Sequence, residues 1–295
     1  MPQRPADALL REGKVLFDKE EYGTARHWFR ACKHRYPNAQ AAEEATYLNA
    51  ESNRLRRYST TALAAYREFA ENFPNSRFAV AAAEGEYQMG IAQIDGKIGG
   101  GFLFGPNRSL GVDILEHMQI AYKNHSLADD ALVKVANYQM KEKRYEEAID
   151  TCKRILSDYP RREHTLYVRY LLATAQWHRS EGPRYDEELL VGALRTLQDF
   201  IATTDDAPDR AQKYKVQIAA SEKLIVRVRE RLGGKQVLIG DFYERRGEPT
   251  SAMVYYRYCI REYPATDAAK KAEKRLGVLD KRPADEPQAK EAPDS

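Results

Sequence analysis

The 295-residue sequence has few cysteines, little net charge and no long hydrophobic run. Its three cysteines cannot all pair within one chain, and they lack the spacing of a metal site. A net charge of only +3 argues against a nucleic-acid-binding protein, which usually has a strongly basic face. No segment approaches the roughly 18 apolar residues of a membrane-spanning helix, and the start of the chain has no apolar signal-peptide core. Because a signal or lipid anchor can be removed, this leaves the compartment open.

Motifs for catalysis or cofactor binding are also missing. None of the six histidines has the helical partner and nearby carboxylate of a zinc site, and no serine lies in a GxSxG motif. The glycine-rich stretch after Gly90 fails the phosphate-loop pattern, because Gly96 comes one residue too late and Lys97 is followed by isoleucine. We therefore expect a protein that is not an enzyme, with no catalytic residue, no metal and no cofactor.

One amphipathic helical pattern recurs along the chain. In KRYEEAIDTCKRILSDYP (143–160), Ala148, Cys152 and Ile155 fall on one helical face, and a proline ends the segment. Similar segments end at Pro37, Pro74 and Pro264. The pattern predicts repeated helices that each bury one apolar face.

The segments share a register of about 34 residues, with small side chains near positions 8, 20 and 27 and a bulky one near position 24. Counted back from each proline, these positions hold Gly13, Ala25, Phe29 and Cys32; Ala50, Ala62, Tyr66 and Phe69; Ala136, Ala148, Cys152 and Ile155; and Gly240, Ala252, Tyr256 and Cys259. Two further repeats, interrupted by insertions within 95–107 and 179–188, place Gly90, Gly111, Leu115 and Met118, and Ala173, Ala193, Leu197 and Phe200 there. This register resembles the tetratricopeptide family.

The resemblance implies an all-α fold, a right-handed superhelix of about six helix pairs. We expect repeats over 6–206, then a second region over 207–279. This region would contain a continuous connecting helix over Ala207–Leu232, the last repeat, and a capping helix over Asp267–Leu279. The segment 280–295 has almost no apolar residue and is expected to be disordered.

Two groups of residues are candidates for partner binding. In tetratricopeptide-like folds the first helix of each pair lines a concave groove, where asparagine and tyrosine suit an extended peptide. The candidates there are Asn49, Asn53, Tyr66 and Arg67, with ordinary hydration as the alternative.

The second group lies in the first insertion. Phe102 and Phe104 form either an exposed apolar tip for a partner or a plug for the groove, and both readings stay open.

The cysteines fall on inward-facing repeat positions, so we interpret them as small buried hydrophobes rather than redox groups.

The segment 227–266, with Phe242, Tyr243, Arg245, Arg246 and Gly247 at its centre, resembles the BamD-type outer-membrane assembly lipoproteins. The resemblance implies a lipid-anchored scaffold on the periplasmic face of the outer membrane. Its C-terminal repeats would bind the barrel-inserting subunit, and its N-terminal groove would bind unfolded outer-membrane protein C-termini.

The residues that the resemblance implies for partner binding are Arg245, Arg246, Arg257 and Tyr255, which stands where that family tends to place arginine. The alternative function is a general peptide-binding tetratricopeptide adaptor in another envelope complex or in the cytoplasm.

Overall fold

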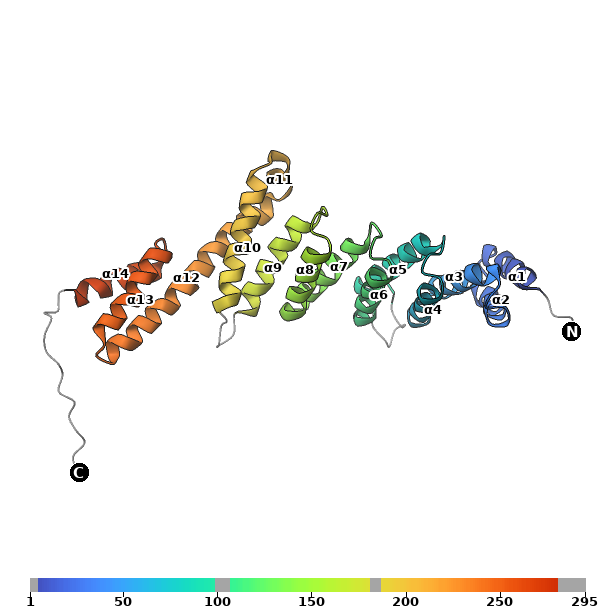
Figure 1. Cartoon of the computed structure of the whole chain (residues 1–295), viewed down its shortest axis with the longest axis horizontal. Coiled ribbons are helices and arrows are strands. Elements are labelled where there is room, and N and C mark those ends of the chain that lie inside the picture. The colour runs from blue at the N-terminus through green and yellow to red at the C-terminus, as the bar shows by residue number, and fades with distance from the viewer. Residues whose placement is uncertain (1–4, 99–106, 181–186, 281–295) are drawn as a thin grey trace, which may run out of the picture. The chain divides into compact units, whose positions relative to one another are not determined.

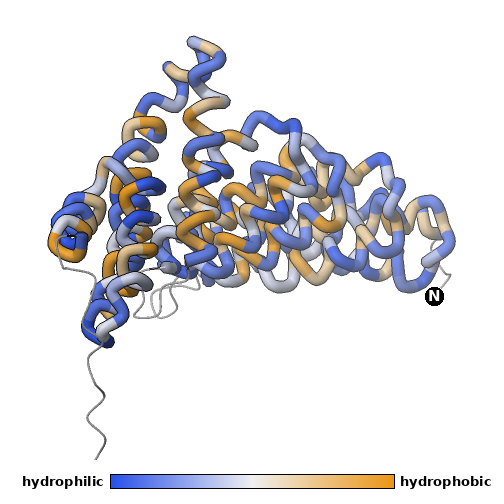
Figure 2. Tube along the Cα trace, turned by 60° about the vertical axis from the view of Figure 1, so that its left-hand side comes forward, coloured by the Kyte–Doolittle hydropathy of each residue, from blue (hydrophilic) through white to orange (hydrophobic). Residues whose placement is uncertain are grey.

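The computed structural model describes residues 5–98, 107–180 and 187–280, and these form fourteen α-helices and no strand (Figure 1). Hydrophobic and hydrophilic residues are mixed along the helices in Figure 2, as expected of amphipathic helices. Among the described residues, no helix is both long and apolar enough to cross a membrane. The all-α fold expected from the sequence is confirmed.

Twelve of these helices form six consecutive pairs. They are α1 (Ala6–Asp18) with α2 (Tyr22–Arg35), α3 (Gln40–Leu55) with α4 (Ser59–Asn72), α5 (Ala79–Ile94) with α6 (Arg108–Ala121), α7 (Ala128–Lys141) with α8 (Tyr145–Asp158), α9 (Thr165–Arg179) with α10 (Glu187–Asp205), and α12 (Lys215–Arg245) with α13 (Pro249–Glu262). The short α11 (Pro208–Lys213) precedes α12, and α14 (Asp267–Leu279) follows α13 with the bounds expected for a capping helix. The handedness of the stack stays a prediction.

The repeat register is confirmed by burial. Every side chain assigned to position 20, 24 or 27 in the six repeats is buried, as is every residue at position 8. The reason for small residues at position 8 is close approach of the two helices. A Cβ added to Gly13 would lie 2.5 Å from the Phe29 ring, and one added to Gly240 would lie 2.5 Å from the Tyr256 ring. Glycine therefore makes room for the large side chain at position 24.

The chain packs as two compact units, unit 1 (Met1–Leu171) and unit 2 (Leu172–Ser295), each described here by itself. This boundary lies within α9, whereas the division expected from repeat content, at residue 206, stays a prediction. The core of unit 1 is a series of apolar clusters between successive pairs. They centre on Phe29 in α2, on Tyr66 and Phe69 in α4, and on Leu115 in α6.

Unit 2 has two apolar clusters that share α12. Leu224, Val228 and Leu232 pack against α10, whereas Val237 packs with Tyr256 of α13 and with α14. The connecting helix expected to run without a break over Ala207–Leu232 starts near the expected place, but its continuity and its end are wrong. The helix is interrupted at Tyr214, and α12 then continues through the two glycines to Arg245.

Packing explains why the two glycines do not end α12. A Cβ on Gly233 would lie 3.1 Å from the Cβ of Ala268, and the Cys259 thiol donates to the Gly233 carbonyl oxygen at 3.4 Å. Close contact with α13 and α14 therefore outweighs the roughly 1 kcal/mol cost of each glycine in a helix.

The three cysteines are buried and free, in agreement with their interpretation as small core residues. Burial raises the pKa of the Cys152 thiol to about 12 and that of Cys259 to about 11, with the negative charge of Glu230 adding to the latter. Because only the thiolate is strongly nucleophilic, these environments favour inert thiols.

Candidate protein-interaction surfaces

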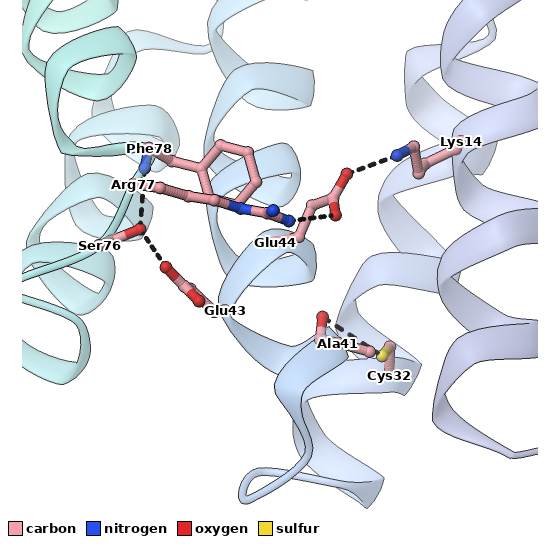
Figure 3. A network of polar contacts seen from close by, with 8 residues as sticks. All are labelled: Lys14, Cys32, Ala41, Glu43, Glu44, Ser76, Arg77 and Phe78. Atoms are coloured by element: carbon pink, nitrogen blue, oxygen red, sulfur yellow. Dashed lines mark hydrogen bonds and ion pairs between the residues drawn. The ribbon is translucent and has the colours of Figure 1, made fainter.

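The first helices of the N-terminal repeats are joined by a chain of ion pairs (Figure 3). Glu44 on α3 accepts from Lys14 on α1 at 2.6 Å and pairs with Arg77, just before α5, at 3.3 Å. In the same region Ser76 donates to Glu43 and accepts from the backbone N–H of Phe78 at 3.0 Å. Lys14 and Arg77 are about half and two-thirds exposed, so a partner can reach both cations.

Aromatic rings lie next to these charges. The Tyr47 ring stacks on the Phe78 ring with centroids 5.0 Å apart, and the Arg77 guanidinium lies 4.7 Å from the centroid of Phe78. Burial, and then the negative charge of Glu51, raise the pKa of Tyr47 to about 12. The tyrosine therefore stays neutral and acts as a hydrogen-bonding aromatic at physiological pH.

The N-terminal candidates from the sequence divide into buried and exposed residues. Asn49, Asn53 and Tyr66 are 4%, 1% and 0% exposed, whereas Arg67 is exposed. The Asn53 side chain donates to the Asn49 carbonyl oxygen at 2.8 Å. The structure thus places three of the four inside unit 1 and leaves Arg67 at the surface; their part in partner binding stays a prediction.

Tyr66 belongs to a buried charged network that sequence reasoning missed. Its hydroxyl donates to the carboxylate of Glu51, which is 6% exposed and forms a 2.7 Å ion pair with Arg54. Burial and the neighbouring Glu51 raise the pKa of Tyr66 well above its ordinary value. The signal in the sequence was the polar pair Glu51 and Arg54, three residues apart on a helix whose other face is alanine-rich.

At the end of unit 2, the structure gathers part of the C-terminal candidate set. Tyr255 stacks on Tyr243 with centroids 5.4 Å apart, and Phe242 packs edge-on against Tyr243 at 5.5 Å. The Arg246 guanidinium lies 5.5 Å from the centroid of Phe242. We call Phe242, Tyr243, Arg246 and Tyr255 the aromatic–arginine row. Arg246 is 62% exposed in its side chain and Phe242 is 46% exposed, so the row is open to a partner.

The other C-terminal candidates lie elsewhere. Arg245 is exposed at the end of α12. Arg257 follows Tyr255 by two residues and so points to a different side of α13, where it pairs with Asp280 at 3.7 Å. The candidates Phe102 and Phe104 lie outside the described residues, so their prediction is untested.

A second buried tyrosine, Tyr256, follows Tyr255 on α13. Tyr256 donates to Asp241 at 2.7 Å and to Glu244 at 3.1 Å, and Lys271 on α14 donates to Asp241 at 2.8 Å. Burial alone would raise the pKa of Asp241, but the hydrogen bonds from Lys271 and Tyr256 outweigh it and lower that pKa. The cluster therefore links α12, α13 and α14 by hydrogen bonds.

Comparisons with known proteins bear on what these surfaces do. Comparison with curated proteins gives no match. Among solved structures, a tetratricopeptide repeat protein from Parabacteroides merdae ATCC 43184 is 12% identical, with 93% of this chain and 98% of that chain covered and a TM-score of 0.34. The apo form of RapI is 11% identical, with 92% and 84% covered and a TM-score of 0.33.

The family model YfiO, described as outer membrane lipoprotein, matches residues 107–284, which is more than half of the chain. The match includes α12, α13 and α14, and therefore the whole aromatic–arginine row. The chain belongs to the YfiO family of outer membrane lipoproteins, the BamD type that its segment 227–266 resembles.

Proposed function

We propose that the protein is a non-catalytic scaffold that holds protein partners during assembly of outer-membrane β-barrel proteins, on the periplasmic face of the outer membrane. The observation that carries the proposal is the family match over 107–284 together with the exposed aromatic–arginine row inside it. Aromatic and arginine side chains provide most of the binding energy in many protein interfaces.

The aromatic–arginine row is the proposed contact for the periplasmic domain of the barrel-inserting subunit. Phe242 and Tyr255 offer apolar area on rigid rings, and Arg246 offers a cation at the edge of that area. Apolar area bordered by charge is the composition of a specific, reversible interface.

The exposed cations Lys14, on α1, and Arg77, just before α5, are the proposed contact for unfolded outer-membrane protein C-termini. Lys14 and Arg77 flank Glu44, and the stacked Tyr47 and Phe78 lie beside them. A terminal carboxylate would pair with a cation of this set, and an apolar side chain of the terminal segment would pack beside the partly buried rings.

The test measures binding of the purified chain to each partner separately. Arg246→Glu combined with Phe242→Ala is expected to weaken binding of the barrel-inserting subunit's periplasmic domain by at least about ten-fold, the usual effect of removing interface anchors. Lys223→Glu, an exposed charge reversal in the middle of α12, is the matched control and should bind like the wild type.

For the second contact, Lys14→Glu with Arg77→Glu should weaken binding of an outer-membrane protein C-terminal peptide and leave binding of the subunit domain intact. If the wild-type chain binds neither probe, the assembly role is wrong. The general peptide-binding adaptor then becomes the better proposal.

A further inference from the structure

The second helix of the chain, α2, has four arginine and lysine side chains and no acidic residue. Three of these cations lie on one face of the helix, because they are three or four residues apart: Arg26, Arg30 and Lys33. Lys33 forms an ion pair with Glu68 on α4. Arg26 and Arg30 form no ion pair with any residue that the structure describes, so this face of α2 has positive charge without a counter-charge.

Arg56, the residue that follows α3, brings a further cation to this face. Its guanidinium carbon lies 3.6 Å from the place that a Cβ on Gly23 would take, and Gly23 is one turn before Arg26 on α2. Arg26 donates to the side-chain oxygen of Asn53 at 3.4 Å, and Asn53 is one turn before Arg56. The two guanidiniums therefore lie in the same seam between α2 and α3. We call Arg26 and Arg56 the arginine pair.

The arginine pair is held in place and partly shielded from water. The Arg56 guanidinium lies 4.3 Å from the centroid of the Tyr58 ring, and the bond to Asn53 fixes Arg26. Nε of Arg26 and Nη1 of Arg56 are buried without an acceptor in the described part of the chain, while both residues stay partly exposed. Two like charges repel more strongly where water is excluded. An anion that reaches the exposed part of both guanidiniums would relieve this repulsion.

Apolar side chains border the arginine pair. Tyr58 is 52% exposed, and Leu55, immediately before Arg56, is 37% exposed. The same combination occurs in unit 2, where Arg246 is at repeat position 14 like Arg56 and its guanidinium also lies near an exposed aromatic ring. Tyrosine and arginine together are typical of the residues that bind proteins. An anion carried on a polypeptide therefore suits this place better than a free ion.

We propose that the arginine pair binds a carboxylate side chain from an acidic segment of a partner protein. The carboxylate oxygens accept from the guanidiniums of Arg26 and Arg56, whose planar forks match the geometry of a carboxylate. Neighbouring apolar side chains of the segment pack on Tyr58 and Leu55. This contact uses side-chain carboxylates, so it is separate from the contact proposed above for a chain terminus at Lys14 and Arg77. The proposal does not depend on the assembly role.

The experiment compares two fluorescent peptides on the full chain: (Glu-Leu-Gly)₃ amide and (Gln-Leu-Gly)₃ amide, which differ only in charge. The C-terminal amide removes the terminal carboxylate, so that only side chains can supply the anion. Fluorescence anisotropy at low salt, where ion pairs are least screened, measures each affinity. The glutamate peptide should bind at least about ten-fold more tightly, a difference of about 1.4 kcal/mol. Equal binding of the two peptides, or no binding of the glutamate peptide, would overturn the proposal.

Variants locate the site. Arg26→Gln combined with Arg56→Gln removes both guanidiniums and should reduce the affinity for the glutamate peptide at least about ten-fold. Arg26→Lys combined with Arg56→Lys keeps both charges but removes the forks, so it should weaken binding several-fold; it also stays informative if the glutamine variant fails to fold. Arg11→Gln combined with Arg35→Gln removes two exposed charges elsewhere in unit 1 and is the control. If the control weakens binding as much as the double glutamine variant of the pair, the pair is not the site.

A second probe separates a protein carboxylate from a lipid phosphate. Cosedimentation with phosphatidylglycerol vesicles is expected to be the same for the wild type and for the variant with Arg26→Gln and Arg56→Gln. If the vesicles bind only the wild type and the glutamate peptide binds neither protein, the arginine pair recognises lipid phosphate and the proposal is wrong.

Discussion

Tyr256 on α13 donates its hydroxyl to Asp241 on α12 at 2.7 Å, and Tyr66 on α4 donates in the same way to Glu51 on α3. Both tyrosines are at repeat position 24, and both acids are at position 9. Two repeats far apart in the sequence thus join their helices through the same buried bond between a phenol and a carboxylate. A hydrogen bond to a charged group contributes more than one between neutral groups.

Tyr256→Phe should lower the free energy of unfolding by about 1.5–3 kcal/mol, because it removes hydrogen bonds to two carboxylates. Urea denaturation followed by circular dichroism measures the change. Tyr258→Phe is the control, because Tyr258 is 39% exposed on the same helix and a surface change of this kind stays within about 0.5 kcal/mol. Equal effects of the two variants would show that the phenol–carboxylate bond adds nothing.

Two glycines of α12 should respond to alanine with opposite sign. Gly234→Ala adds a Cβ that meets nothing within 4 Å and should stabilise the protein by about 0.5–1 kcal/mol. Gly240→Ala puts its Cβ 2.5 Å from the Tyr256 ring and should destabilise by about 1–3 kcal/mol, the usual cost of overpacking. Thermal unfolding of both variants measures the difference, and a stabilising Gly240→Ala would contradict the close approach at position 8.

The turn between the paired helices has a left-handed residue at position 15, which is Glu20, Arg57, Lys143 or Gly247, with φ between 59° and 74°. Gly247→Ala should destabilise by about 1 kcal/mol, because a Cβ is unfavourable in this conformation. Lys143→Gly relieves the same strain, but glycine also makes the unfolded chain more flexible, so we expect a net gain below about 1 kcal/mol. Differential scanning calorimetry measures the stability of both variants. If both variants were less stable than the wild type, the left-handed φ angles would not be maintained.

The stability of unit 1 should depend on pH through Glu86 on α5. Burial raises the pKa of this fully buried carboxyl above its ordinary value of 4.5, although the hydrogen bond and charge of His117 and the charge of Arg67 act in the other direction. The folded state holds the proton more tightly than the unfolded state. The contribution to stability is therefore complete below pH 4.5 and is lost as the pH rises through the folded pKa.

Glu86→Gln mimics the protonated carboxyl, so its stability relative to the wild type should increase as the pH rises from about 4.5 to 8. Urea denaturation at several pH values measures this difference. Glu84→Gln, at an exposed position of the same helix, should show no such trend. A constant difference for Glu86→Gln would mean that the buried carboxyl keeps its ordinary pKa.

The residues that sequence periodicity located are those whose role depends on size. Positions such as Gly13, Ala62 and Leu115 could be assigned because two helices in contact need small residues opposite large ones. This size pattern recurs in every repeat, so it can be read from the sequence. The end of a helix is harder to assign from local signals. Gly233 does not end α12, because its close contact with α14 favours the helix, and the connecting helix is interrupted at Tyr214, whose ring packs on Phe200 of α10.

The candidate surfaces could be predicted only in part, because they depend on which side chains meet across helices. The stacking of Tyr243 on Tyr255 joins residues 12 positions apart without a periodic signal, and the bond between an acid at position 9 and a tyrosine at position 24 occurs in only two of the six repeats. Asn49, Asn53 and Tyr66 are polar enough to suggest a surface, yet all three are buried, and the Asn53 and Tyr66 side chains form hydrogen bonds inside unit 1. A polar side chain in an α-helix shows neither its burial nor its partner in the sequence alone.

α12 packs into two apolar clusters, with Leu224 and Val228 in one and Val237 in the other. In a repeat array each repeat normally contacts only its neighbours, so one repeat can unfold locally while the others stay folded. The single 31-residue helix α12 is part of two apolar cores, so local unfolding of one core disrupts the other. Native-state hydrogen exchange should therefore show α10 and α13 opening together with one common free energy, so that unit 2 unfolds as one cooperative block rather than repeat by repeat.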